Sequence, residues 1–410
     1  MSSRYRTRSR WRRRSKEALL QKPDGDTELR EVMAEAIRKS RALLCYECGK
    51  CSGICPVARF DAGFSPRSLL IRAARGETDK LIRDQTVWSC LTCGLCDTRC
   101  PVAIDYGLLT KVMRTVVRRE GGEGTCTHGG AVQSLTRIMK AKTLKQDRLG
   151  WVDASLKTRS KGGTVYFVGC APYFDVLFSE TGASSLDGAR GAVRLLNAAG
   201  ITPALLPNER CCGHDMLWSG DVEGFLALAG ENLKLLEEAG AKRVVFSCPE
   251  GYALFKNEYP AHFGPLPFEV VHITEVLAEA VEAGTLTFGD GPEVTVTFQD
   301  PCRLGRHMGI YDAPRMILEA MPGVTLADMP RSRARAICCG VGNWMNCTSF
   351  TKQLQATRLR EAGGTGASVL VTACPKCEIH FSCALDDSIL KDEVGLEITD
   401  LMALAASRLE

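Results

Sequence analysis

Two runs of cysteines near the N-terminus repeat one spacing, C-x2-C-x2-C-x3-C-P. The first run ends at Cys55 and Pro56, and the second run ends at Cys100 and Pro101. In proteins with this spacing, the first three thiolates of a run bind one [4Fe–4S] cluster, and the fourth binds the cluster of the other run. The sequence therefore predicts two clusters, one held by Cys45, Cys48, Cys51 and Cys100 and the other by Cys90, Cys93, Cys96 and Cys55.

A pair of zinc sites is the alternative for these eight cysteines. Zinc is usually bound by four ligands that come in pairs, whereas each run supplies three closely spaced cysteines and a fourth before a proline. The repeated pattern favours iron–sulfur clusters. Gly49 and Gly94 lie inside the runs, where the backbone must approach cluster sulfides closely.

The remaining part of the chain carries a second cysteine pattern, here called the twin-cysteine repeat. Each copy has one cysteine, then a C-C-G motif, then a cysteine that ends a strand-like run. The first copy supplies Cys170, Cys211, Cys212 and Cys248, and the second supplies Cys302, Cys338, Cys339, Cys374 and Cys377. Five thiolates are one more than a cubane cluster needs, and adjacent thiolates can bind different irons of an unusual cluster.

The two copies differ at their last position. The second copy ends in C-P-K-C, whereas the first reads S-C-P-E-G-Y and has Gly251 where the second has Cys377. The first copy therefore predicts a four-thiolate site that holds either an iron–sulfur cluster or zinc.

The segments that must position these cysteines predict a helical region followed by an α/β region. Residues 64–88, between the N-terminal runs, read as helix. Further on, β-branched runs such as TVYFVGC and VLVTACPKC alternate with helical stretches, which is typical of parallel α/β sheets. Four of these runs end on a cysteine, and ligands of open α/β sheets bind at the carboxyl ends of strands.

We therefore expect a fold of two pseudo-repeated α/β domains with parallel sheets, preceded by a helical ferredoxin-like domain. The helix that leads into the first run is expected at 31–44, and the connector is expected to be helical over 131–157. The expected segments are a basic flexible tail at 1–30, the double-[4Fe–4S] domain at 31–120, a connector at 121–162, and α/β domains at 163–288 and 291–410.

Composition and charge limit the classes of function and partner that the chain can have. The chain has 410 residues, and its net charge of +4 does not indicate a nucleic-acid partner. The positive excess is mostly local, because the first 16 positions hold eight basic residues and no acidic one. This segment is either a solvated tail or a contact for an anionic membrane face or an acidic partner. The sequence predicts neither a transmembrane segment nor a signal peptide. Clustered cysteines then suit a reducing, anaerobic cytoplasm, with attachment at the inner membrane face through a partner as the alternative.

The two patterns together resemble a known family. The twin-cysteine repeat resembles the cysteine-rich CCG domain of the heterodisulfide reductase catalytic subunit, and the N-terminal runs resemble that enzyme's small iron–sulfur subunit. Their combination over about residues 35–410 is similar to the fused catalytic subunit of the membrane-linked enzyme and its bacterial relatives.

The resemblance implies an iron–sulfur oxidoreductase subunit. Electrons would pass through two [4Fe–4S] clusters to a noncubane [4Fe–4S] cluster on the five cysteines of the second copy, where a disulfide or related two-electron acceptor is reduced. The alternative is a non-catalytic electron-transfer subunit of an aromatic thioester reductase or of a lactate- or glycolate-type dehydrogenase. Expected partners are cytochrome b, flavoprotein or electron-bifurcating subunits.

Several other residues near these motifs are weaker candidates. His214, His307 and His380 either donate a proton to a leaving thiolate or, as we favour, hold structure near a cluster. Arg303 and Arg306 either bind an anionic substrate or offset cluster charge. Three cysteines outside the patterns are expected to be buried small hydrophobic side chains: Cys126, Cys347 and Cys383.

Overall fold

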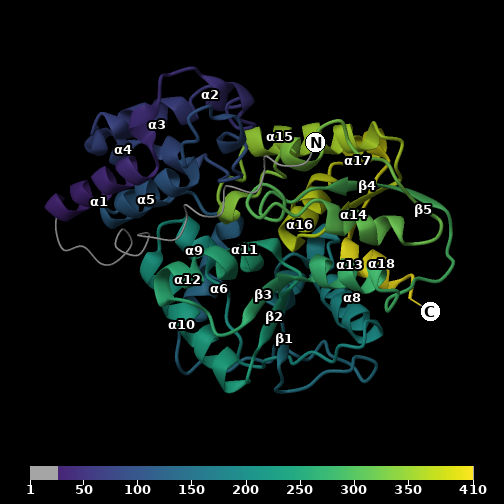
Figure 1. The fold of residues 1–410 in the computed structure, drawn as a ribbon. Coiled ribbons are helices and arrows are strands. Elements are labelled where there is room, and N and C mark those ends of the chain that lie inside the picture. The colour runs from purple at the N-terminus through teal and green to yellow at the C-terminus, as the bar shows by residue number, and fades with distance from the viewer. Residues whose placement is uncertain (1–25, 410) are drawn as a thin grey trace.

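The computed structural model describes residues 26–409, so most of the basic tail predicted at 1–30 lies outside the described residues. A helical region comes first, and two parallel sheets surrounded by helices follow (Figure 1). The predicted fold class is confirmed. The boundaries of the individual domains stay predictions.

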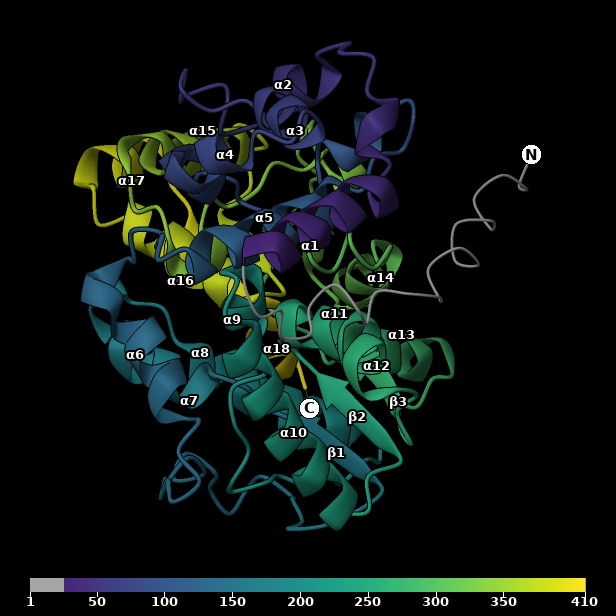
Figure 2. The same ribbon diagram turned by 90° about the vertical axis from the view of Figure 1, so that its left-hand side faces the viewer.

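The helical region contains five α-helices. They are α1 (Asp26–Lys39), α2 (Lys50–Ile54), α3 (Pro66–Ala74), α4 (Thr78–Arg83) and α5 (Tyr106–Arg119). Of these, α1 and α4 pack against α5. Figure 2 shows α1 lying along α5, with this region above the first sheet. The helix predicted over 64–88 is confirmed as three pieces, α3, α4 and a 3-10 turn at Gln85–Trp88, because Gly76 adopts a φ of +71° that ends the first piece.

The first helix differs from its predicted bounds of 31–44. It begins at Asp26 and ends at Lys39. Its buried face, at Leu29, Val32, Met33, Ala36 and Ile37, has the spacing of one helix stripe and extends further toward the N-terminus than we predicted. At the other end, Arg41 takes a left-handed conformation with φ 65°, which breaks the helix before the first cysteine.

Each copy of the twin-cysteine repeat contains one all-parallel sheet. The first has the order β1 (Thr164–Phe167), β2 (Arg243–Phe246), β3 (Glu269–His272). The second has the order β5 (Val324–Leu326), β4 (Val294–Gln299), β6 (Val369–Thr372), β7 (Glu397–Asp400). Cys170, Cys248, Cys302 and Cys374 follow the carboxyl ends of β1, β2, β4 and β6 within three residues, so the predicted placement of these thiols is confirmed.

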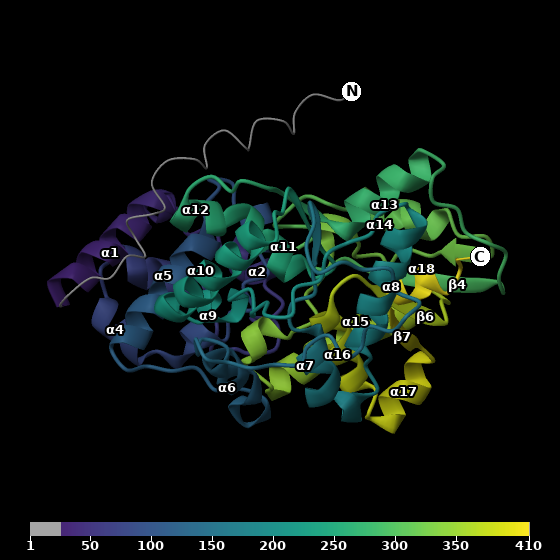
Figure 3. The same ribbon diagram turned by 90° about the horizontal axis from the view of Figure 1, so that it is seen from below.

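Helices surround both sheets and join the two copies. Those of the first copy are α7 (Ala171–Leu177), α8 (Ser185–Ala198), α9 (His214–Trp218), α10 (Val222–Glu238), α11 (Pro249–Asn257), α12 (Tyr259–Phe263) and α13 (Ile273–Glu282). Those of the second are α14 (Asp312–Glu319), α15 (Ser349–Gly363), α16 (Pro375–Ala384), α17 (Ser388–Val394) and α18 (Leu401–Ala406). The last helix, α18, packs against α8 of the first copy (Figure 3).

The connector is less helical than predicted. Helix α6 covers only Ala131–Ile138, so the prediction of helix over 131–157 is wrong beyond residue 138. The rest of the connector is fixed by side chains. Arg148 is buried and donates hydrogen bonds to the carbonyl oxygens of Gly169 and Glu209, and its guanidinium pairs with the Glu209 carboxylate at 2.7 Å. These bonds hold the chain in an irregular path against the first copy.

Candidate iron–sulfur and twin-cysteine sites

Cysteines of both N-terminal runs line one cavity in the helical region. They are the four predicted to share a cluster, Cys55, Cys90, Cys93 and Cys96. The backbone N–H of Thr92 donates to the sulfur of Cys90 at 3.3 Å. Burial raises the pKa of Cys55, Cys90 and Cys96, so these thiols need a cation to ionise in place. Four thiols converging on a cavity, with a backbone donor, fit a [4Fe–4S] cluster.

The other four cysteines of the runs lie at the surface of the helical region. Cys45 follows a 3-10 turn at Ala42–Leu44, and Cys100 follows another at Asp97–Arg99 that contacts α2. Desolvation and the nearby Cys48 and Cys100 raise the pKa of Tyr46, which places both thiols close to this one ring. Cys48 is exposed, whereas the other three thiols are half-buried. This predicted cluster is therefore the more accessible of the two.

The four cysteines of the first copy line a single cavity beside the ends of β1 and β2. Hydrogen bonds from Cys170 and Cys212 hold the pKa of Cys211 well below its usual range. Gly251 lines the same cavity, and a Cβ built on it would lie 3.1 Å from the Phe246 ring. A cysteine at this position therefore requires the phenyl ring to shift by a few tenths of an ångström.

The second copy brings five cysteines around one cavity: Cys302, Cys338, Cys339, Cys374 and Cys377. Their thiols form a continuous set of hydrogen-bonding contacts, in which Cys338 touches Cys302 and Cys339, and Cys377 touches Cys339 and Cys374. This set is richer in sulfur than one cubane requires and fits an iron–sulfur group with more than four thiolates.

The glycine of each C-C-G motif has a shared structural role. Gly213 and Gly340 have φ values of +87° and +100°, a region that favours glycine. In each copy this turn directs the glycine N–H to the sulfur of the first twin cysteine, Cys211 or Cys338, at 3.4 Å. The motif thus supplies two thiols and a backbone donor that can stabilise thiolate charge.

The second run lies directly against the second copy. A hydrogen bond from Cys338 lowers the pKa of Cys93 to about 5, which places a thiol of the second run next to a thiol of the twin-cysteine site. Arg303 donates to the carbonyl and hydroxyl oxygens of Thr92 at 3.1 and 2.7 Å, and Arg306 Nε donates to the Cys93 carbonyl at 2.7 Å. Both arginines therefore bind the loop of the second run.

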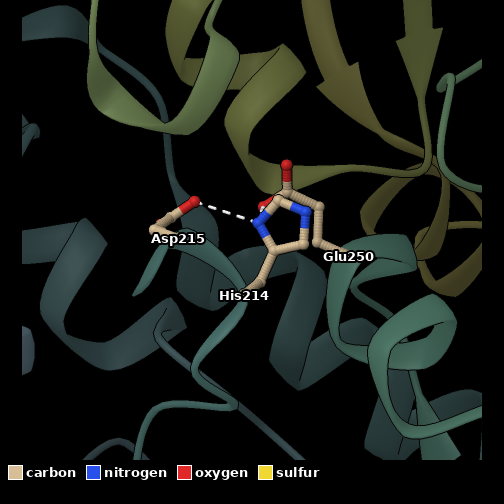
Figure 4. Close-up of side chains that lie close together, drawn as sticks. All are labelled: His214, Asp215 and Glu250. Atoms are coloured by element: carbon tan, nitrogen blue, oxygen red, sulfur yellow. Dashed lines mark hydrogen bonds and ion pairs between the residues drawn. The ribbon is translucent and has the colours of Figure 1, made fainter. Parts of the chain in front are cut away.

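The two twin-cysteine sites meet at a buried group of charges. Lys376, from the C-P-K-C motif of the second copy, pairs with Asp215 at 2.5 Å and with Glu250 at 2.6 Å. His214 Nδ1 lies 3.0 Å from Asp215 and 3.3 Å from Glu250 (Figure 4). Burial lowers the pKa of His214, so its ring is neutral near pH 7. The three residues of the first copy have the atom types of a metal site, but the Lys376 ammonium already pairs with both carboxylates.

Sequence reasoning missed Asp215, Glu250 and Lys376. The sequence did contain a signal. Glu250 lies two residues after Cys248, and Lys376 lies two residues after Cys374, so the two charges occupy equivalent positions of the repeat. The structure shows that these two oppositely charged positions face each other. Glu250 also lines both twin-cysteine cavities.

The weaker candidates have mixed outcomes. His307 lies 3.1 Å from the Thr92 carbonyl, and His380 Nδ1 lies 2.8 Å from the Cys339 carbonyl, contacts that suit the structural role we favoured. The prediction that the remaining cysteines are buried is wrong: Cys126 and Cys347 are exposed, and Cys383 is half-buried. The backbone of Cys126 forms an isolated antiparallel bridge with that of Met345.

The described part of the chain contains no helix that is both long and apolar enough to span a bilayer.

Comparison with known families agrees with the two cysteine patterns. Residues 41–104 match the family described as a 4Fe-4S dicluster domain. Residues 164–256 and 296–382 each match the family described as a cysteine-rich domain. The chain therefore contains one dicluster domain and two cysteine-rich domains, and it is an iron–sulfur protein.

Similar curated proteins are oxidoreductases and components of them. One component of the dihydromethanophenazine:CoB–CoM heterodisulfide reductase of Methanosarcina barkeri is 35% identical over 65% of this chain and 63% of its own length. The probable iron–sulfur-binding oxidoreductase FadF of Bacillus subtilis is 36% identical over 56% of this chain and 34% of its own. The EtfAB:quinone oxidoreductase of Syntrophomonas wolfei is 33% identical over 52% and 30%. The matched region thus spans less than two thirds of each relative.

Proposed function

From a dicluster domain joined to two cysteine-rich domains, we propose an oxidoreductase subunit that carries electrons between a partner protein and the twin-cysteine site of the second copy. A disulfide or related two-electron acceptor is reduced there. One observation carries the proposal: Arg303 and Arg306 of the second copy bind the loop of the second run at Thr92 and Cys93, and Arg306 also binds the Ala336 carbonyl, two residues before Cys338. The exposed first run, the buried second run and the five-cysteine cavity then form one series.

The donor sets support the cofactors. The two runs would hold [4Fe–4S] clusters, and the second copy would hold a noncubane [4Fe–4S] cluster on its five cysteines. The first copy, with four thiols and Gly251, would hold another iron–sulfur cluster or zinc. When bound, such clusters carry one electron at a time, and the surrounding protein sets their reduction potentials.

The residues of the chain itself have three roles in this function. Thiols of the second copy bind the group that faces the acceptor, and burial of Cys338, Cys339, Cys374 and Cys377 excludes water from it. The Gly340 N–H stabilises charge on the Cys338 sulfur. Lys376 of the second copy pairs with Asp215 and Glu250 of the first copy and so joins the two twin-cysteine sites.

A second candidate function is electron transfer without catalysis in a larger oxidoreductase. Gly251 leaves the first copy one thiol short, so only the second copy supplies five cysteines. Relatives such as the EtfAB:quinone oxidoreductase show that similar regions occur in longer proteins named for other acceptors. Cytochrome b, flavoprotein or electron-bifurcating subunits are the partners that this candidate requires.

The test compares two cysteines of helix α16. The full chain, purified without oxygen, is assayed for disulfide reduction with reduced viologen, and Cys377→Ser is compared with Cys383→Ser. Cys377 lines the five-cysteine cavity, whereas Cys383 lies outside it. We expect the first variant to lose turnover and the EPR signal of the twin-cysteine site, and the second to keep both. A wild-type chain that holds all its clusters and reduces no disulfide would instead favour the non-catalytic candidate.

A further inference from the structure

Large apolar side chains are exposed around the first run. Leu43, Leu44 and Tyr46 are 63%, 51% and 60% exposed, and Cys48 beside them is exposed as well. Among the described residues, these are three of the eight large hydrophobic side chains that solvent reaches most. We call Leu43, Leu44 and Tyr46 the first-run patch. Clustered exposed apolar side chains mark interaction sites more often than scattered ones do.

The backbone holds this patch outward. Arg41 and Glu47, which flank it, both have left-handed backbone conformations, with φ of 65° and 58°. The Cys45 N–H donates to the Ala42 carbonyl at 3.1 Å, and the Arg67 guanidinium donates to the Glu47 carbonyl at 3.4 Å. Non-glycine residues in this conformation are concentrated at functional sites, because the surrounding structure must stabilise them. The loop that carries the first-run patch is therefore fixed by hydrogen bonds, and its apolar side chains are held in their exposed positions.

Basic side chains surround the patch. Arg41 and Lys50 border it in sequence, Arg67 reaches the loop, and Arg99 precedes Cys100 of the same predicted cluster; all four are exposed. The acidic residue within this stretch, Glu47, lies 3.9 Å from Arg75. Within the described residues no ion pair involves Arg41, Lys50 or Arg99. An apolar centre with a charged rim is the usual composition of a protein interface.

We propose that the first-run patch is the docking surface of an acidic one-electron carrier protein. The inference rests on the proposed function, because it names the partner at the exposed end of the electron-transfer series. Cys48 lies within the surface, so a carrier bound there approaches the first predicted cluster without crossing a layer of protein. A basic rim attracts an acidic carrier over a distance and accelerates its encounter. Three apolar side chains suit the small interface of a transient redox encounter.

The experiment follows electron transfer from a chemically reduced acidic ferredoxin to the full, cluster-loaded chain by stopped-flow absorbance. Two variants change the surface, Leu43→Ser with Leu44→Ser, and Arg41→Glu with Lys50→Glu. The matched control is Ile389→Ser with Lys391→Glu on α17, where Ile389 is 79% exposed and the three views place the helix apart from α2. Iron content and EPR spectra verify that each variant retains its clusters, and reduced viologen tests reduction that needs no docking.

We expect both surface variants to be reduced by the ferredoxin at least about tenfold more slowly than the parent chain, with the charge variant losing its salt dependence. The control variant and all viologen rates should be unchanged. Parent rates in both surface variants would overturn the proposal. So would a charge variant that loses only its binding to phosphatidylserine vesicles, because the rim would then serve a membrane. If viologen fails to reduce the clusters of the parent chain, the proposed function itself fails.

Discussion

Two arginines, the buried Arg303 and the half-buried Arg306, place positive charge on the loop of the second run. Arg303 and Arg306 belong to the second copy, yet their hydrogen bonds go to Thr92 and Cys93. Arg306 is also bonded to the Ala336 carbonyl, just before the twin cysteines. A cation in a buried site favours the state with more negative charge, and reduction adds an electron. These side chains therefore favour electron uptake at the junction.

The first prediction concerns Arg306→Gln. Glutamine keeps a hydrogen-bond donor near the Cys93 carbonyl but removes the charge. We expect the midpoint potential of the second-run cluster to fall, by about 59 mV for each tenfold loss in the one-electron reduction equilibrium. EPR-monitored redox titration measures it. Arg335→Gln is the control, because Arg335 is exposed and bonded to the Pro330 carbonyl. A potential equal to that of the parent would show that Arg306 only holds the loop.

The predictive power of single residues was uneven. For one predicted cluster, the cysteine spacing predicted four thiols that line a common cavity, Cys55, Cys90, Cys93 and Cys96, because ligand spacing is set by the size of the cluster. It did not predict the contact of Cys93 with Cys338, which depends on how two regions pack. The Lys376 ion pairs were missed for the same reason: each charge was read within its own motif, whereas its partners lie in the other copy.

At the scale of elements, the strands were easier to predict than the connections. Apolar β-branched runs of four to six residues form β1, β2, β4 and β6, because these strands are buried and nothing else in the sequence competes with that pattern. Helix α6 and the rest of the connector were harder. There, Arg148 and Glu209 determine the path through a buried ion pair that no local pattern reports.

The packing of α18 on α8 gives the second prediction. A Cβ on Gly191 of α8 would lie 2.3 Å from the Met402 carbonyl of α18, so only glycine allows this approach. We expect Gly191→Ala to lower the free energy of unfolding by about 1–3 kcal/mol. Gly230→Ala in α10 is the control, because a Cβ there meets nothing within 4 Å, and alanine should stabilise that helix by up to about 1 kcal/mol. Anaerobic urea denaturation compares them, and equal effects would contradict the packing.

At the scale of the whole molecule, the helical region and both copies are connected through buried polar contacts. Arg114 of α5 donates to the carbonyls of Val87, Trp88 and Cys90 and also to Trp218 of the first copy. Arg303, which belongs to the second copy, stacks on the same Trp218, and its guanidinium carbon lies 4.1 Å from the ring centre. The loop of the second run is thus fixed from both sides. The electron transfer that we propose across this junction therefore requires no movement of one region against another.

The central claim is that the cysteine sites form one electron-transfer series ending at five thiolates. The most direct test measures iron, sulfide and zinc per chain, with EPR of the oxidised and reduced forms, on protein purified without oxygen. The account predicts about twelve to sixteen irons, four for each [4Fe–4S] cluster, with one EPR signal that is lost in Cys338→Ser. About eight irons with one or two zincs would contradict it, because only the N-terminal runs would then carry electrons and the two copies would be a scaffold.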